Sequence, residues 1–435
     1  MNGRSLLALI NDQAIGTLQE INGLWAFQYT DAWLNTPTRF PLSPHLPLTR
    51  HQLIDGATLR HVQWYFDNLL PEENQRILLA NDARLDAADA FGLLAYYGAE
   101  SAGSVTLLPP EFIQQPAGNL QPLADVTLSA RIRQMPKTPL THAAVKRMSL
   151  AGAQHKLAVV LDNGMLFEPV GARPSTHILK PDHPDPDYPH SVANEWFVMR
   201  LARKIGLDVP PVHRRYVPEP VYLIDRFNRV LHKYHWQRRH VIDACQLLGL
   251  DRSFKYVQGS MDSLAALATA CRSPAVARTR LFSWLVFNVL TGNGDAHLKN
   301  LSFIVSHEGI QLAPHYDLLS TACYDSRSFD KPGWPEQTTL AWPIMGEQRF
   351  ANINQALLLD AGAKLNLAKT TAKRLLDDLR GKIVQAAEAL YAEVEAENVG
   401  LVAQRPELAV TLAGESRCLR AIAHVVIKDM AAKLM

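Results

Sequence analysis

The first hundred residues alternate short apolar runs with polar turn residues. Residues 5–30, SLLALINDQAIGTLQEINGLWAFQYT, interrupt their apolar runs at NDQ and at NG, a pattern typical of β-hairpins. Near Ala99, the stretch GAESAGSVTLLPP predicts a turn, a short strand and a proline stop. We therefore expect a small α/β domain over residues 1–110. Residues 111–147, which are rich in Pro, Gln, Thr and Ala, are expected to form a linker with one helix.

From residue 148 the pattern favours strands. Residues 149–170 predict a strand, a DNG turn and a second strand, and THILKP at 176–181 predicts a third. One helix is predicted in SVANEWFVMRLARKIGLDVP, where apolar residues recur at helical spacing until Gly206. Residues 148–227 are therefore expected to form a β-rich lobe.

Beyond residue 227 helical spacing predominates. Residues 263–272, residues 276–292, residues 367–397 and the last thirty residues all show it. In the stretch 367–397, one helix face is shared by Leu375, Leu376, Leu379, Ile383 and Leu390. We expect an all-helical lobe over residues 228–435, and hence an α+β protein of two lobes. Ligands usually bind in the cleft that such a division creates.

Composition narrows the class of protein. Of the 435 residues, 47 % are hydrophobic and 20 % are charged, which excludes a disordered chain. The net charge of +2 gives no strong long-range field, so nucleic-acid binding would need a local basic patch. The four cysteines lack the spacing of a zinc module, and the longest apolar run, LFSWLVFNVLTG, is shorter than the roughly 20 residues of a membrane span. With no secretory apolar run at the N-terminus, we expect a soluble cytoplasmic protein with reduced thiols and no membrane contact.

The densest group of reactive side chains is NGDAHLKN at residues 293–300, between a predicted helix and the strand LSFIV. Phosphoryl transfer from ATP needs a carboxylate that orients the attacking hydroxyl, and oxygen ligands for Mg²⁺ close by. Asp295 fits the first requirement, and Asn300, five residues later, fits the second. Asp317, in PHYDL after the strand, is expected to be a further Mg²⁺ ligand.

A kinase also needs a cation on the nucleotide phosphates. Lys180 ends the predicted strand THILK, where its charge would be costly without an anionic partner, and Glu195 on the next helix could form an ion pair with it. An edge-strand lysine and a solvent-exposed helix residue are the alternatives. The small-residue stretch SLAGAQHK at 149–156 could cover the phosphates, with Gly152 allowing the backbone to turn, although an ordinary turn fits it as well.

Taken in order, SLAGAQHK, THILK, ANEWFVMRLARKIGLDVP, IDRFNR, NGDAHLKN and PHYDL resemble the HipA family of bacterial serine/threonine toxin kinases, and so do YFDNLLPE and GAESAGSVTLLP before them. The resemblance implies a protein-kinase-like fold in which Asp295 is the catalytic aspartate, Asn300 and Asp317 bind magnesium and Lys180 binds the ATP phosphates. It further implies a mobile phosphate loop of Ala151, Gly152, Ala153, Gln154, His155 and Lys156, an autophosphorylated serine at Ser149, an adenine-contacting segment of Asp225, Arg226 and Phe227, and nucleotide contacts near His297 and Lys299.

The same resemblance implies cofactors and partners. It implies an ATP- and Mg²⁺-dependent kinase that phosphorylates a serine or threonine of a translation factor, such as a glutamyl-tRNA synthetase, and so arrests growth. A HipB-like helix-turn-helix antitoxin would restrain it and carry it to an operator DNA. Two alternatives stay open: a small-molecule or lipid kinase on the same scaffold, and a weakly active nucleotide-binding corepressor that acts with a DNA-binding antitoxin.

Overall fold

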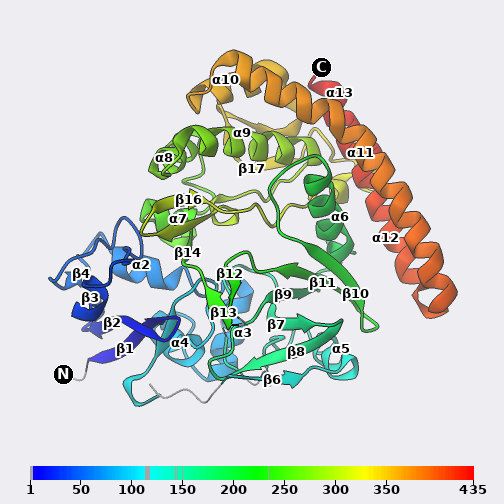
Figure 1. The fold of residues 1–435 in the computed structure, drawn as a ribbon. Helices are drawn as coiled ribbons and strands as arrows, with labels where there is room; N and C mark the ends of the chain where they lie inside the picture. The colour runs from blue at the N-terminus through cyan, green and yellow to red at the C-terminus, as the bar shows by residue number, and fades with distance from the viewer. Residues whose placement is uncertain (1–2, 113–117, 143, 145, 149, 234) are drawn as a thin grey trace. The chain divides into compact units, whose positions relative to one another are not determined.

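The computed structural model describes residues 3–112, 118–142, 144, 146–148, 150–233 and 235–435. The chain folds into two compact units, each built from separate stretches of sequence. Unit 1 contains Met1–Pro181, Leu223–Phe254 and Ser302–Ala313, and unit 2 contains Asp182–Tyr222, Lys255–Leu301 and Pro314–Met435. Figure 1 shows the elements coloured along the chain. The domain boundaries proposed from the sequence stay predictions.

Unit 1 begins with a five-stranded antiparallel sheet in the order β4-β3-β2-β1-β5. Its strands are β1 (Arg4–Ile10), β2 (Gln13–Ile21), β3 (Leu24–Tyr29), β4 (Leu53–Ile54) and β5 (Thr106–Leu108). The turns at Asn11–Asp12 and Asn22–Gly23 have φ values of 48°, 66°, 54° and 76°, which are the left-handed conformations of tight hairpin turns. The predicted hairpins and the predicted strand before the proline stop are confirmed.

Helices pack on this sheet and complete the small α/β domain. They are α1 (Asp31–Leu34), α2 (His61–Asp67), α3 (Glu73–Ala83) and α4 (Ala90–Tyr97). Large aromatic side chains fill the interface: the Phe27 and Phe66 rings lie 5.5 Å apart, and the Trp25 and Phe91 rings 5.2 Å apart. All four side chains are buried, so their contact area holds the domain together.

A second set of antiparallel strands in unit 1 runs in the order β9-β7-β8-β6. It consists of β6 (Asn119–Pro122), β7 (Leu157–Asp162), β8 (Met165–Val170) and β9 (His177–Pro181). The predicted turn between β7 and β8 is confirmed, since Asn163 and Gly164 have φ values of 47° and 78°. The expected linker helix is α5 (Asp125–Arg133), but the linker also holds β6, whose polar sequence NLQP gave no strand signal.

The expected all-helical lobe is corrected in one respect, because the region after residue 227 also contains strands. They are β12 (Arg229–His232), β13 (His235–Arg238), β14 (Val241–Asp243), β15 (Ser302–Ser306), β16 (Gly309–Leu312), β17 (Thr339–Ile344) and β18 (Glu347–Arg349). β14, β15 and β16 form a small sheet in unit 1, beside α7 (Ala244–Leu248). Polar hairpins such as β12–β13 carry no apolar alternation, and hydrophobic periodicity therefore misses them.

Unit 2 is mainly helical. Its longer helices are α6 (Ser191–Lys204), α8 (Met261–Ala270), α9 (Pro274–Thr291), α10 (Gln355–Lys364), α11 (Lys369–Gln404), α12 (Ala409–Ala421) and α13 (Ile427–Lys433). β10 (Val212–Tyr216) also belongs to it, and β11 (Pro220–Asp225) begins in it. The predicted helix that ends at Gly206 is confirmed as α6, and Gly206 has the left-handed φ of 97°.

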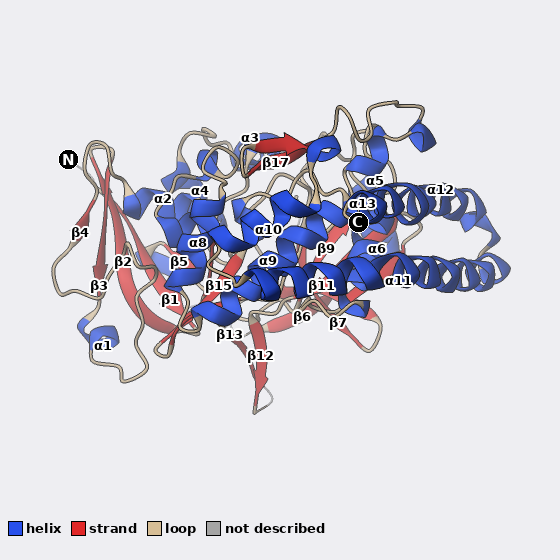
Figure 2. Ribbon diagram, turned by 90° about the horizontal axis from the view of Figure 1, so that it is seen from above, coloured by secondary structure: helices blue, strands red, loops and turns tan. Residues whose placement is uncertain are grey.

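The apolar stretch of α9 lies in the core of unit 2. Phe282, Trp284 and Phe287 are almost completely buried within it. In the described part of the chain, no helix combines the length and the apolar character that a membrane crossing would need. α11 and α12 run side by side in both views (Figures 1 and 2). On the predicted apolar face of α11, Leu375 is only partly buried, and the buried residues are Leu376, Leu379, Ile383 and Leu390.

Candidate active site

The loop at residues 293–300 follows directly from the end of α9. Gly292 terminates that helix with a left-handed φ of 64°, and Asn293 comes next, with its side chain buried. The Asn293 side-chain amide donates to Asn288 Oδ1 at 2.8 Å, and Asn293 Oδ1 accepts the backbone N–H of Asp295 at 3.0 Å. A buried asparagine thus fixes the backbone of Asp295 to the helix.

Further contacts fix the other end of the loop. Asn300 Nδ2 donates to the backbone oxygen of Asp295 at 2.9 Å, and the indole N–H of Trp342 in β17 donates to the backbone oxygen of Ala296 at 3.0 Å. Gly294 lies so close to β17 that a Cβ atom there would be 2.6 Å from the backbone oxygen of Thr339. These contacts hold the loop in place, and they bring the Asn300 side chain to the backbone of Asp295.

The Asp295 side chain accepts a hydrogen bond that the sequence did not reveal. The Tyr256 hydroxyl donates to Asp295 Oδ1 at 2.6 Å. The Tyr256 ring also packs edge-on against His297, with ring centroids 5.0 Å apart. Tyr256 lies 39 residues before Asp295 in a segment without periodicity or motif spacing, so no sequence signal pointed to it.

Tyr316, the residue before Asp317, forms a hydrogen bond with the loop at residues 293–300. The Tyr316 hydroxyl donates to the backbone oxygen of Lys299 at 2.7 Å, and Asp317 itself has a left-handed φ of 56°. Non-glycine residues in that conformation are strained and cluster at functional sites. Burial raises the pKa of Tyr222 well above its usual value, and the negative charges of Glu195 and Asp317 raise it further. Both carboxylates therefore lie near the Tyr222 phenol.

These donors fit a magnesium ion. A carboxylate and an amide oxygen are ligands that Mg²⁺ accepts. The Nδ2 atom of Asn300 is used in the bond to Asp295, which leaves its Oδ1 atom as the oxygen for a cation, and the side chain is buried. The chemistry of Asn300 and Asp317 thus suits Mg²⁺, and the metal site that the two residues would share stays a prediction.

The predicted phosphate lysine and its partner are both buried. Lys180, in β9 of unit 1, and Glu195, in α6 of unit 2, are each 5 % exposed. The alternative of a solvent-exposed residue is therefore wrong for Glu195, because a carboxylate this buried must be compensated by bonds or charges. The ion pair between these two residues stays a prediction.

The two ends of the predicted phosphate loop are joined by a hydrogen bond. The Lys156 ammonium donates to the backbone oxygen of Ala151 at 2.8 Å. Gly152 has a φ of 106°, and a Cβ atom there would lie 2.4 Å from Lys156 Nζ, so the turn requires glycine. Of the remaining loop residues, His155 is buried, whereas Ala153 and Gln154 are partly buried. Ser149 lies outside the described residues.

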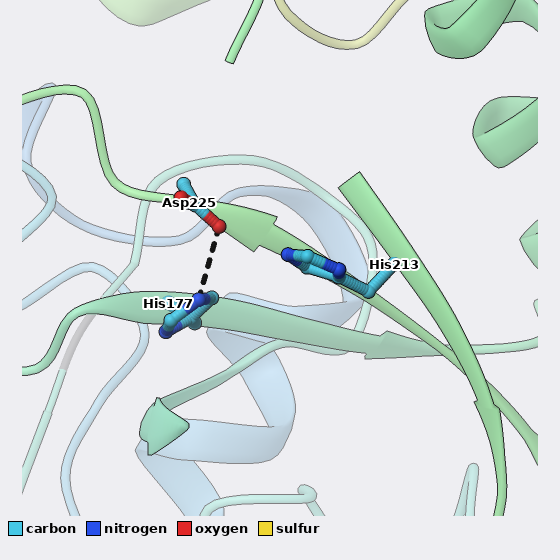
Figure 3. A group of neighbouring side chains, drawn as sticks. All are labelled: His177, His213 and Asp225. Carbon is cyan, nitrogen blue, oxygen red and sulfur yellow. Dashed lines mark ion pairs between the residues drawn. The ribbon is translucent and has the colours of Figure 1, made fainter. Parts of the chain in front are cut away.

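The predicted adenine segment begins with Asp225. His177 Nε2 and Asp225 Oδ1 form an ion pair at 3.0 Å (Figure 3). The backbone N–H of Arg226 donates to the backbone oxygen of Thr176 at 2.8 Å, and Phe227 follows. The Arg226 side chain is buried and its guanidinium binds Glu100 at 3.1 Å, so it is not available to a ligand. Any contact of Arg226 with a nucleotide is limited to its backbone.

Glu100 is the centre of a buried charge cluster in unit 1, named here the Glu100 cluster. Its carboxylate is fully buried and binds four cations at 2.8–3.1 Å. These cations are Lys146, Arg226, Arg229 and Arg238. Burial alone would raise the pKa of Glu100, but the four cations outweigh it and hold the pKa well below its usual value. The cluster fixes the segment after Asp225 to the small α/β domain.

Comparison with known proteins identifies the family. Residues 148–387 match the model of the HipA-like C-terminal domain, and residues 6–108 match that of the HipA N-terminal domain. The chain belongs to the HipA family. It is therefore a HipA-type serine/threonine protein kinase, and kinases of this family use ATP. The resemblance seen in the sequence is confirmed.

Individual relatives agree with this assignment. A putative kinase, Y4mE, of Sinorhizobium fredii is 36 % identical over 71 % of this chain and 75 % of its own. The serine/threonine-protein kinase toxin HipA of Shewanella oneidensis is 33 % identical over 69 % of this chain and 71 % of its own. A solved structure of HipA from that organism, with HipB and its operator DNA, matches 98 % of this chain and 99 % of its own with a TM-score of 0.76 and 26 % identity. The α+β, protein-kinase-like HipA fold with its N-terminal domain is confirmed.

Proposed function

We propose that this HipA-type kinase transfers the γ-phosphoryl group of ATP to a seryl or threonyl hydroxyl, with Asp295 as the residue that orients the acceptor. The acceptor oxygen bonds to the γ-phosphorus as the bond to the β–γ bridging oxygen breaks, ADP leaves, and the hydroxyl proton passes to Asp295. The observation that supports this role most directly is the fixed loop: Asn293 and Asn300 hold the backbone of Asp295 on both sides.

Asn300 and Asp317 are proposed to hold Mg²⁺. When bound, the ion would neutralise charge on the transferred phosphates and orient them. The cation of Lys180 would contribute further charge compensation, and residues Ala151–Lys156 would have to release the internal bond from Lys156 to Ala151 before their amides could face phosphate.

The proposed acceptors are a translation factor, such as a glutamyl-tRNA synthetase, and Ser149 of this chain. A phosphate dianion on Ser149, beside amides that would otherwise face ATP, would compete with the nucleotide. The proposed regulator is a HipB-like helix-turn-helix protein that carries the kinase to operator DNA. This partner is supported by the Shewanella relative, whose solved complex contains HipB and DNA. The proposed location is the cytoplasm, where these partners would be found.

The decisive experiment is incubation of the purified chain with labelled ATP and Mg²⁺, followed by mass spectrometry. We expect phosphoserine or phosphothreonine on protein, near-complete loss of transfer in Asp295→Ala, and ATP affinity close to that of the wild type in that variant. Asp330→Ala is the matched control, since the Asp330 side chain is 95 % exposed in the same unit, and it should transfer normally.

Three results would contradict the proposal. Normal transfer by Asp295→Ala would remove the proposed role of this residue. Label in a small-molecule or lipid fraction, with none on protein, would favour the small-molecule kinase. ATP binding by the wild type without any transfer would favour the nucleotide-binding corepressor.

A further inference from the structure

Tyr256 lies on the segment that leads into α8, and its hydroxyl reaches the carboxylate of Asp295. The distance from Tyr256 Oη to Asp295 Oδ1 is 2.6 Å. Tyr256 is 37 % exposed, and the next residue, Val257, is 79 % exposed. The phenol that binds Asp295 therefore belongs to a partly exposed residue and not to the core of unit 2.

Several contacts place the Tyr256 ring. The backbone N–H of Leu298, in the loop at residues 293–300, donates to the backbone oxygen of Lys255 at 3.1 Å, which ties the Tyr256 segment to that loop. The Tyr256 ring lies at 81° to the His297 ring with centroids 5.0 Å apart, and Lys255 Nζ lies 5.1 Å from the Tyr256 ring centroid. Because these contacts come from the neighbouring Lys255 and from the loop at residues 293–300, the position of the phenol is set by the site itself.

The geometry of this bond matches the one that the reaction requires. A catalytic base must lie about 2.6–3.2 Å from the hydroxyl whose proton it takes. The phenol of Tyr256 is a hydroxyl that donates to Asp295 at such a distance. A seryl or threonyl acceptor, or a water molecule, would have to make the same kind of bond to Asp295.

We propose that Tyr256 is a placeholder: its hydroxyl occupies the acceptor position on Asp295 until a protein acceptor displaces it. This inference rests on the proposed role of Asp295. The consequence is protection of ATP, because water is kept from the carboxylate oxygen that would otherwise activate it. Rotation of a partly exposed ring on a surface segment would open the site without disturbing the helical core.

Tyr256→Phe tests the proposal, since it removes the hydroxyl and keeps the ring against His297. Phosphate release from ATP and Mg²⁺, without added protein, should rise about tenfold over the wild type, which is the lower range for a hydrogen bond to a charged group. ATP affinity should not change. Tyr391→Phe, in α11, is the matched control and should behave as the wild type.

A second measurement needs no activity. Tetranitromethane nitrates accessible tyrosines, and mass spectrometry reports the rate at each one. We expect Tyr256 to react several-fold faster in Asp295→Ala than in the wild type, with Tyr391 unchanged as an internal reference. Equal rates at Tyr256 would show that the contact does not exist in solution.

The outcomes separate this inference from the proposed function. If the wild type transfers phosphate and Tyr256→Phe releases phosphate at the same rate or more slowly, the placeholder is wrong and the proposed function stands. A slower rate would instead make Tyr256 a positioning residue for Asp295. If the wild type binds ATP but neither transfers nor releases phosphate, the proposed function fails, and the placeholder fails with it.

Discussion

The Glu100 cluster makes a specific prediction about stability. Glu100→Gln keeps the size of the side chain and removes its charge, which leaves four buried cations without their shared anion. The Ser175 hydroxyl also donates to the carboxylate at 2.9 Å. A glutamine at this position would offer one acceptor oxygen where the carboxylate offers two, and it would place its N–H donors against the four buried cations. Breaking a buried ion pair by removing one partner typically costs about 3–5 kcal/mol, and four cations put Glu100→Gln at the upper end of that range.

The assay is thermal unfolding followed by circular dichroism, with urea unfolding as a second measure. In a domain of 150–250 residues, a loss of about 1 kcal/mol in the free energy of unfolding lowers Tm by roughly 2–4 °C. Glu100→Gln should therefore melt about 10 °C or more below the wild type. Glu20→Gln is the matched control. Glu20 pairs with Arg4 at the surface, where an ion pair contributes at most about 1 kcal/mol.

The stability difference should depend on pH. Because the folded pKa of Glu100 lies well below the ordinary value of 4.5, its contribution is complete above that value and is lost as pH falls through the folded pKa. Wild type and Glu100→Gln should therefore differ most near neutral pH and converge in acid. A variant that melts like Glu20→Gln, or a difference that stays constant with pH, would refute the account of the cluster.

Three further predictions concern other parts of the chain. Lys180→Met keeps the buried aliphatic part of the side chain but removes its charge. It should weaken ATP binding, measured by calorimetry, at least about tenfold, because a charge-assisted contact with the phosphates is lost. An unchanged ATP affinity would show that Lys180 does not contact the phosphates. Gly152→Ala should destabilise the loop by about 1 kcal/mol or more in urea unfolding, because it combines a positive φ with a clash on Lys156. Gly164→Ala, which has a positive φ but no neighbour within 4 Å, should cost less. Burial raises the pKa of Asp182 to about 7, so the stability of the wild type should fall relative to that of Asp182→Asn as pH rises from about 4 to 7. A difference between the two that does not change with pH would contradict this prediction.

Local pattern predicted the elements whose formation depends on neighbouring residues. The turn at Asn163–Gly164 follows from the left-handed preference of those two residue types, and α6 follows from apolar spacing and a glycine stop. The order of motifs around Asp295, Asn300 and Asp317 indicated the family. These features could be found because each is encoded within a short stretch of chain.

Long-range contacts between charged or polar residues could not be predicted in this way. Glu100 lies 46 residues from Lys146 and 138 from Arg238, and charged residues are normally exposed, so nothing in the sequence marked them as a buried cluster. Arg226 is an example. The motif predicted that its segment contacts a nucleotide, but its side chain forms an ion pair with Glu100. Tyr256 was missed for the same reason.

The backbone and the carboxylate of Asp295 are held by different residues. Its backbone is held by Asn293 and Asn300, which lie within the loop, whereas its carboxylate is held by Tyr256, which comes from a different segment. The backbone bonds persist whatever binds at the carboxylate, because neither uses a side-chain atom of Asp295. The bond from Tyr256 can therefore be exchanged for one from an acceptor while the loop keeps its position. If Asp295 has the proposed role, a site built in this way stays preorganised for transfer and still withholds its base from water.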